Sequence, residues 1–328
     1  MSRCKVRAHA NIALSKYWGK SDLALNLPAV PSVSMTLDGL VTETEVRFDT
    51  RLRTDRVFLD GRRASAAERQ RVVEVLDQVR SAAGHLQRAE VRSANHFPTA
   101  AGLASSASGF AALAAAATRA AELDWDDKRV SALARQASAS AARSVFGGFV
   151  ELPAGKPGQA SLAARPLHDE RYWDLRIVVA ETAKGPKKVG STAGMERSRR
   201  TSPYYEAWVA AAPKLSAQVK RGLKLRDLPL LGAAMEQSTL AFHACAMASA
   251  PGILYFQPAT LAALATVRDL RDRRGVEVFA TMDAGPHVKA LCHVDDVGRV
   301  RRALTRTEGV IATGVSAPGP GVEILEWD

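Results

Sequence analysis

Short apolar or alternating stretches, bounded by Asp and Gly, dominate the first sixty residues of the chain. They predict antiparallel strands at 6–11, 41–48 and 57–59. Asp60-Gly61 follows the third stretch directly and is a typical two-residue hairpin turn. From 66 to 83 the apolar residues Val72, Leu76 and Val79 recur at helical spacing instead, so we expect a helix there.

The same reading, continued along the chain, predicts a mixture of strands and helices in two halves. Further strands are expected at 91–95, 147–152, 175–180, 276–282 and 287–292. Helices are expected at 105–123, 127–136, 204–223, 228–247, 258–274 and 294–305. The Pro- and Gly-bearing segment 153–158 reads as a loop, and we place the boundary between the halves near His168. The pattern indicates an α+β protein of two domains.

Composition supports a globular enzyme rather than a nucleic-acid-binding protein. The 328 residues are 47% hydrophobic and 24% charged, which is ordinary for a soluble domain. The formal net charge is +11, but the basic residues are scattered and their runs are short. We therefore expect a solvated Arg-rich surface and no nucleic-acid partner; the positive field would help to capture a polyanionic substrate.

The thiols and the apolar segments indicate a cytoplasmic protein without a membrane partner. Cys4, Cys245 and Cys292 are odd in number and form no C-x-x-C, which favours reduced thiols. Charged residues interrupt the first thirteen positions, so no secretory signal is visible. The most apolar helical stretch, 110–117, is too short to cross a bilayer.

The segment 95–110, NHFPTAAGLASSASGF, joins a Pro- and Gly-bearing loop to an Ala-rich helix through consecutive serines. The first amides of a helix have no intrahelical acceptor and the helix dipole is positive there, so small residues at this point let a polyphosphate approach. Ser105 and Ser106 add hydroxyls for phosphate or a hydrated Mg²⁺. The spacing is not that of a P-loop, and a plain helix cap remains an alternative.

Three further segments match sequence motifs of one protein family. They are NIALSKYWGK from Asn11 with LNLP and SVSMTL after it, ASASAARSVFGG from Ala137, and TMDAGPH from Thr281. Together with FPTAAGLASSASG they resemble the diphosphomevalonate decarboxylase family of the GHMP kinase superfamily, from about residue 8 to residue 286.

The resemblance implies a two-domain GHMP kinase-like fold with the active site in the cleft between the domains. Residues 1–168 would form a ribosomal-protein-S5-like domain that binds ATP and substrate. Residues 169–328 would form a ferredoxin-like α/β domain that carries the catalytic Asp.

The implied reaction is the ATP- and Mg²⁺-dependent decarboxylation of mevalonate 5-diphosphate, through phosphorylation of its 3-hydroxyl. The products are isopentenyl diphosphate, ADP, phosphate and CO₂, in the mevalonate pathway of isoprenoid biosynthesis, and the implied assembly is a homodimer. Three alternatives stay open: a decarboxylase of mevalonate 5-phosphate, a mevalonate 3-kinase, and a non-catalytic nucleotide-binding paralogue.

The resemblance also implies site residues. The catalytic residues would be Asp283, Lys16 and Arg143. ATP would contact Ala101, Gly102, Leu103, Ala104, Ser105 and Ser106, with Ser106 on the metal. Substrate would contact Tyr17, Trp18, Gly19, Lys20, Arg71, Ser138, Ala139, Ser140, Ala141, Ala142, Arg143, Ser191 and Thr192. Arg69 is an alternative to Arg71, and Asp283 could instead only cap the turn before Gly285.

The chain departs from the family wording at a few positions. Ala137, Ala139 and Ala142 stand where glycines or a cysteine are common, which keeps the loop small but restricts positive φ. His287 replaces a common Asn. For His287, and also for His96 and His243 beside the motifs, we expect structural histidines with satisfied ring nitrogens.

Overall fold

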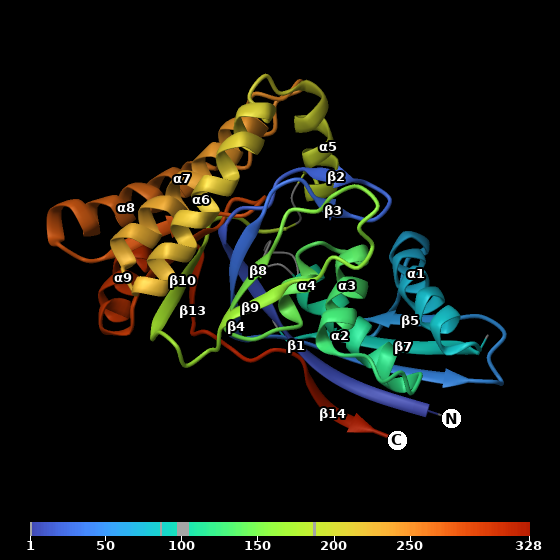
Figure 1. The fold of residues 1–328 in the computed structure, drawn as a ribbon. Helices are drawn as coiled ribbons and strands as arrows, with labels where there is room; N and C mark the ends of the chain where they lie inside the picture. Colours follow the sequence, from blue (N-terminus) through green and yellow to red (C-terminus); the bar gives the residue numbers. More distant parts are fainter. Residues whose placement is uncertain (1, 86, 97–104, 186–187) are drawn as a thin grey trace.

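The computed structural model describes residues 2–85, 87–96, 105–185 and 188–328, arranged as two α+β halves in contact (Figure 1). The first half is built on a long mixed sheet with the strand order β14-β1-β4-β7-β5-β6; in addition, β8 pairs with β4, and β9 pairs with β8. Its strands are β1 (Ser2–Ser15), β4 (Ser32–Asp49), β5 (Arg56–Leu59), β6 (Arg62–Arg63), β7 (Arg88–Asn95), β8 (Phe149–Leu152), β9 (Arg165–His168) and β14 (Glu323–Trp327). A separate small ladder joins β2 (Lys20–Asp22) to β3 (Leu27–Pro28).

The helices of the first half are α1 (Ala66–Ala83), α2 (Ser105–Ala120), α3 (Asp127–Ala137) and the short α4 (Ala141–Ser144). Successive side chains of a strand point to opposite faces of the sheet, so Cys4, Val6 and Ala8 of β1 lie on one face, where they pack in one core with Leu76 of α1. The Ala-rich α2 is central to this core, because small side chains let a helix approach the sheet closely. The helix α2 thereby lies against β1 and β4.

The second half has a four-stranded antiparallel sheet with helices on both faces. Its strands, in the order β11-β12-β10-β13, are β11 (Val278–Thr281), β12 (Val288–His293), β10 (Leu175–Glu181) and β13 (Ala312–Ser316). Its helices are α5 (Ser191–Thr201), α6 (Tyr205–Leu225), α7 (Leu228–Met247), α8 (Pro258–Arg274) and α9 (Val297–Thr305). Ile177 and Val179 face α6 and α7, whereas Val178 and Ala180 face α8 and α9.

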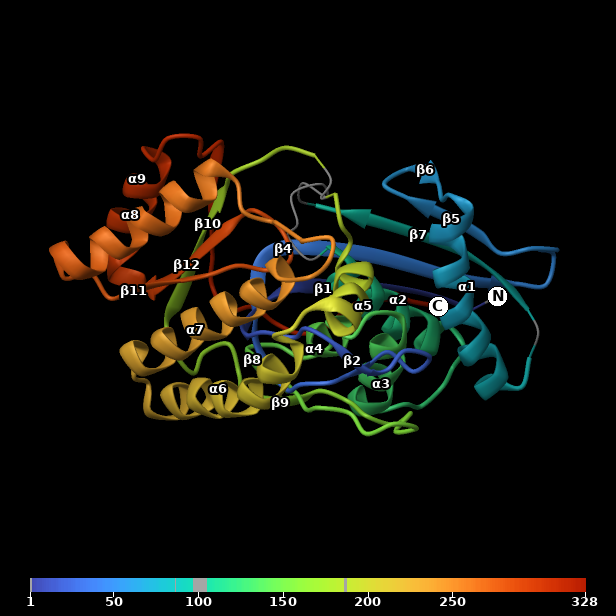
Figure 2. The same cartoon turned by 90° about the horizontal axis from the view of Figure 1, so that it is seen from above.

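A shared core ties the halves together. Ile12 and Leu14 of β1 and Met35 of β4 belong to the same buried cluster as Leu231 of α7 and Leu291 of β12. Seen from above, α5 lies over the region where the halves meet (Figure 2). The loops around this junction can therefore present side chains from both halves to one site.

The expected α+β fold is confirmed, and most strand and helix bounds agree with the pattern to within a few residues. The hairpin at Asp60-Gly61 is also confirmed: both residues have positive φ, and Leu59 pairs with Arg62. The strand predicted at 57–59 is present as β5, but its predicted antiparallel pairing is only partly confirmed: β5 is antiparallel to β6 and parallel to β7.

The sequence pattern missed α4, α5, β2, β3, β9, β13 and β14. After β13 the chain returns to the first half, where β14 pairs antiparallel with β1 (Figure 1). Across the part of the chain that the structure describes, none of the helices has the length and apolar character that crossing a membrane requires.

Candidate active site

A cavity of about 660 Å³ opens at the junction of the two halves. Most of the predicted site residues line it: Lys16, Tyr17, Trp18, Lys20, Arg71, Ser105, Ser106, Ser138, Ala139, Ser140, Arg143, Ser191, Thr192 and Asp283. Among the described lining residues, four are cationic, Lys16, Lys20, Arg71 and Arg143, and one, Asp283, is a carboxylate. A cavity with this excess of positive charge suits a polyanion.

The centre of the cavity is a carboxylate between two ammonium groups. Oδ1 of Asp283 lies 2.9 Å from Nζ of Lys16, and Oδ2 lies 3.2 Å from Nζ of Lys289. The Lys16 ammonium also donates to the carbonyl of Ala13 at 2.8 Å, and its backbone amide donates to Ser238 Oγ at 2.9 Å. The lysine side chains are 3% and 1% exposed, whereas Asp283 is 28% exposed toward the cavity.

This arrangement changes the acidity of the buried groups. Burial alone would raise the pKa of Asp283, but Lys16 and Lys289 outweigh it and hold that pKa well below its usual range. Burial, only partly offset by Asp283, lowers the pKa of Lys16 to about 8. At neutral pH the cluster thus contains an ionised carboxylate and a lysine that is still cationic but loses its proton not far above neutrality.

Arg143 is fully buried on α4 and is oriented by neutral acceptors. Its guanidinium donates to Ser34 Oγ at 3.0 Å, to Ser32 Oγ at 2.6 Å and to Asn11 Oδ1 at 3.2 Å. Of the five N–H donors of an arginine, these bonds engage three and leave two for a ligand. Burial lowers the pKa of Arg143 to about 10, so it stays charged at neutral pH.

Polar side chains surround the rest of the cavity. The hydroxyls of Ser138 and Ser140 lie 3.2 Å apart beside α4. The buried Tyr17 hydroxyl has no hydrogen-bond partner among the described residues, which leaves it available to a ligand. Burial lowers the pKa of Lys20 on β2. The fully buried Trp18 packs on Phe242 with ring centroids 5.1 Å apart, which fixes this segment.

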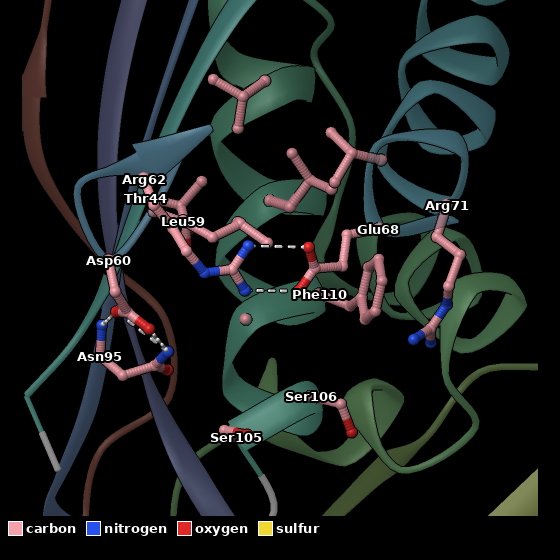
Figure 3. A pocket seen from close by; sticks show the side chains of 15 residues that line it. Thr44, Leu59, Asp60, Arg62, Glu68, Arg71, Asn95, Ser105, Ser106 and Phe110 are labelled. Carbon is pink, nitrogen blue, oxygen red and sulfur yellow. Dashed lines mark hydrogen bonds and ion pairs between the residues drawn. The ribbon is translucent and has the colours of Figure 1, made fainter. Parts of the chain in front are cut away.

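A second cavity of about 300 Å³ adjoins the first and shares Arg71, Ser105 and Ser106 with it (Figure 3). The serines are the first two residues of α2 and lie at one end of this cavity. The Arg71 guanidinium lies 4.4 Å from the centroid of the Phe110 ring. Apolar side chains line much of this second cavity: Leu59, Val72, Val91, Phe110 and Leu113.

The remaining predicted residues lie elsewhere. Gly19, Ala141 and Ala142 do not line the large cavity: a Cβ on Gly19 would meet the Tyr205 hydroxyl at 2.3 Å, and both alanines are fully buried in core clusters. Arg69 lines neither cavity, in contrast to Arg71. The predicted contacts at Ala101, Gly102, Leu103 and Ala104 lie outside the described residues.

Sequence reasoning missed Lys289 and the acceptors of Arg143. A single lysine within the apolar strand VKALC was a usable signal, because charge in a buried strand needs a partner. Asn11, Ser32 and Ser34 were inside quoted motifs, but only the folded sheet brings them to Arg143.

The structure also places the histidines beside the motifs and the alanines that depart from the family motifs. His287 is satisfied, since its Nδ1 accepts from the Thr182 amide at 3.1 Å. His243 corrects the expectation of satisfied rings: it is buried among aromatic rings, and neither ring nitrogen has a hydrogen-bond partner in the described structure. Ala139 and Ala142 are absent from the described residues with positive φ, so alanine is unstrained at both.

The chain is similar to known proteins along most of its length. The model of the diphosphomevalonate decarboxylase-like N-terminal domain matches residues 8–163, and that of the mevalonate 5-diphosphate decarboxylase C-terminal domain matches residues 177–312. The chain is 33% identical to a diphosphomevalonate decarboxylase of Schizosaccharomyces pombe over 303 residues, which cover 87% of this chain and 77% of that protein.

Two solved structures are similar throughout. Mevalonate diphosphate decarboxylase from Staphylococcus aureus superposes with a TM-score of 0.93 at 37% identity, covering 99% of this chain and 98% of the other. A complex of MDDEF with MVAPP, AMPPCP and magnesium superposes with a TM-score of 0.92 at 37% identity, covering 99% of both chains.

Proposed function

The chain belongs to the diphosphomevalonate decarboxylase family, and from this we propose that it converts mevalonate 5-diphosphate and ATP to isopentenyl diphosphate, ADP, phosphate and CO₂. The observation that carries the proposal is the cavity at the junction of the halves, where Asp283, the one carboxylate among the described lining residues, lies among buried cations. The substrate and the nucleotide are both polyanions, and the reaction needs them in contact.

The cations of the large cavity serve the substrate. We assign the diphosphate to Tyr17, Lys20, Ser138, Ser140 and Ser191, which line one cavity and supply hydroxyls and an ammonium. Arg143 has two N–H donors left, in the fork geometry that suits a carboxylate or a phosphate. Its fixed orientation makes it a candidate for binding the carboxylate that is lost as CO₂.

Asp283 acts on the 3-hydroxyl of the substrate. A carboxylate with a pKa far below neutrality is a weak base, so its main contribution is to accept a hydrogen bond from the hydroxyl and aim the oxygen at the γ-phosphate. The proton passes to Oδ of Asp283 as the new P–O bond forms and the bond between the γ-phosphorus and the ADP oxygen breaks. Lys16, at 2.9 Å, stabilises the negative charge on Asp283 and then on the departing phosphate.

ATP and Mg²⁺ are the cofactors of the reaction. The described residues contain no group of three or more His, Cys, Asp or Glu suited to a metal, so a bound Mg²⁺ would rest mainly on phosphate oxygens. The exposed Ser106 at the start of α2 fits one hydroxyl ligand of that kind. When bound, Mg²⁺ would neutralise charge on the β- and γ-phosphates.

We place the base of ATP in the smaller cavity. Its apolar lining and the Phe110 ring suit a flat heterocycle, and the cavity ends at Ser105 and Ser106, where the phosphates would enter the large cavity (Figure 3). This orientation directs the γ-phosphate toward Asp283.

We also propose a cytoplasmic homodimer. All three cysteines are buried free thiols, as suits a reducing compartment. Leu240 and Leu261 are 41% and 59% exposed beside Arg268 and Asp272 on α7 and α8, a surface that mixes apolar residues with both charges and could be self-complementary. Light scattering of the purified protein measures the assembly.

The deciding experiment supplies ATP and Mg²⁺ with mevalonate, its 5-phosphate or its 5-diphosphate in separate reactions, and follows ADP and CO₂ together. We expect equal amounts of both products with the diphosphate only. ADP without CO₂ would instead indicate a 3-kinase, CO₂ from the 5-phosphate would change the substrate, and neither product would indicate a non-catalytic protein.

A further inference from the structure

Lys289 is a buried cation without an assigned role. It lies in β12, where it pairs directly with Thr281, two residues before Asp283. Its ammonium is 1% exposed and lies 3.2 Å from Oδ2 of Asp283, with which it forms an ion pair. Among the described residues, Asp283 is the only ion-pair partner of Lys289.

Packing does not explain a lysine at this position. Desolvating an ammonium costs free energy, and Asp283 already has Lys16 as a counter-ion on its other oxygen. Four groups face the carboxylate from different elements: Lys16 after β1, Lys289 on β12, Arg143 on α4 and His243 on α7. Three of them are cations. Without Lys289, two cations would face one carboxylate; with it there are three, so Lys289 adds electrostatic repulsion to the cluster.

The geometry gives Lys289 a different use. Lys16 holds Oδ1 from the first half of the molecule, and Lys289 holds Oδ2 from the second half. A carboxylate held at both oxygens cannot rotate freely about its Cβ–Cγ bond, so its direction toward the cavity is fixed. On the basis of the proposed function, we propose that Lys289 is a positioning residue, which keeps Asp283 ionised and oriented toward the substrate hydroxyl.

The first test is Lys289→Met, which keeps the length of the side chain and removes its charge. We expect kcat with mevalonate 5-diphosphate to fall roughly 10- to 100-fold, with KM for both substrates changed less than about threefold, because the orienting group does not touch either ligand. Lys220→Met is the matched control: Lys220 pairs with the buried Glu151 at 2.7 Å outside both cavities, and its kcat should stay at the wild-type value.

The second test shows whether Lys289 acts through Asp283. In an Asp283→Asn background, adding Lys289→Met should cost almost nothing further in kcat, because the group to be oriented is already gone. Multiplicative losses would overturn the proposal, as would wild-type kcat in the single variant. A rise in KM at unchanged kcat would also overturn it, because Lys289 would then help to bind the substrate and not to orient Asp283.

A third readout does not depend on turnover. Repulsion from Lys289 contributes to the low pKa of Lys16, so in Lys289→Met the titration of Lys16, followed by NMR of ¹³C-labelled lysine in the free protein, should move upward from about 8. An unmoved midpoint would contradict the coupling. If the wild type forms no product, the proposed function fails while this measurement still decides the inference. Should Lys289→Met not fold, Lys289→Gln serves in all three tests.

Discussion

Nζ of Lys16 lies 2.9 Å from Oδ1 of Asp283, although 267 positions separate the two residues in the chain. Lys16 directly follows β1, the first strand of one half, and Asp283 follows β11 in the other. The pair therefore exists only when the halves are docked. Domain packing and catalytic chemistry thus depend on the same contact.

The pH dependence of turnover should report Lys16. Its pKa of about 8 lies below the ordinary lysine value, so the cation is present below that pH and is lost as the pH rises through it. We expect kcat/KM for the acid substrate to fall along an alkaline limb with a midpoint of about 8. Initial rates of ADP formation measured across the alkaline range check this; a flat profile to about pH 10 would contradict the role of Lys16.

Asp283→Asn keeps the shape of the side chain and removes its charge. ADP and CO₂ formation should both fall by about 10² to 10⁴, because phosphorylation of the hydroxyl precedes the loss of CO₂. Circular dichroism should show a folded protein with a lower Tm, since two buried lysines lose their counter-ion. Normal ADP release without CO₂ would instead assign Asp283 to the elimination step.

Arg143→Lys tests the fork geometry. One ammonium cannot replace the bonds to Ser32, Ser34 and Asn11 and also bind a ligand, so kcat/KM should fall by roughly 10². Arg165→Lys is the control, because Arg165 forms an ion pair with Glu151 outside both cavities and should tolerate the change. Equal kinetics in the two variants would reduce Arg143 to a packing residue.

Ser106 and Ser108, two positions apart on α2, should respond in opposite ways. Ser106→Ala should raise KM for ATP about three- to tenfold with an unchanged Tm, because its exposed hydroxyl faces both cavities. Ser108 is fully buried and bonds to Thr42 Oγ1 at 2.7 Å, so Ser108→Ala should lower the free energy of unfolding by about 1–3 kcal/mol and leave KM unchanged. Thermal melts and ATP titrations of both variants separate binding from packing.

Gly109 offers a test of the base pocket. It lines the smaller cavity, and a Cβ added there would meet nothing within 4 Å. Gly109→Leu should fill the cavity and raise KM for ATP roughly tenfold or more, with KM for the acid substrate unchanged. Gly109→Ala leaves room for the base and should add about 0.5–1 kcal/mol of stability through helix propensity. An unchanged KM for ATP in the leucine variant would place the base elsewhere.

Strong local signals were readable from the sequence. The helix and strand periods gave α1, α2 and α6 to α8 closely, and Asp60-Gly61 gave its hairpin, because each depends on residues within one element. The motif residues could be expected to gather, and most of them line one cavity. Their roles remain predictions.

The missed features depend on tertiary context. The helix α5, STAGMERSRRT, is largely polar, and it packs where Gly194 lets it approach Trp18 so closely that a Cβ would lie 2.8 Å from the indole. Lys289 and the acceptors of Arg143 acquire their meaning only when β12, β1 and β4 are folded together. Periodicity along one segment cannot report such neighbours.

The pairing of β14 with β1 sets an order for folding during synthesis. Cys4 is aligned with Trp327, which lies 323 positions further along the chain, so β1 is synthesised well before the strand that covers its edge. Until residues 323–327 have emerged, β1 has an open edge that offers its amides and carbonyls to any passing strand. A chaperone that shields β1 in the nascent chain would therefore have to stay bound until β14 has been made.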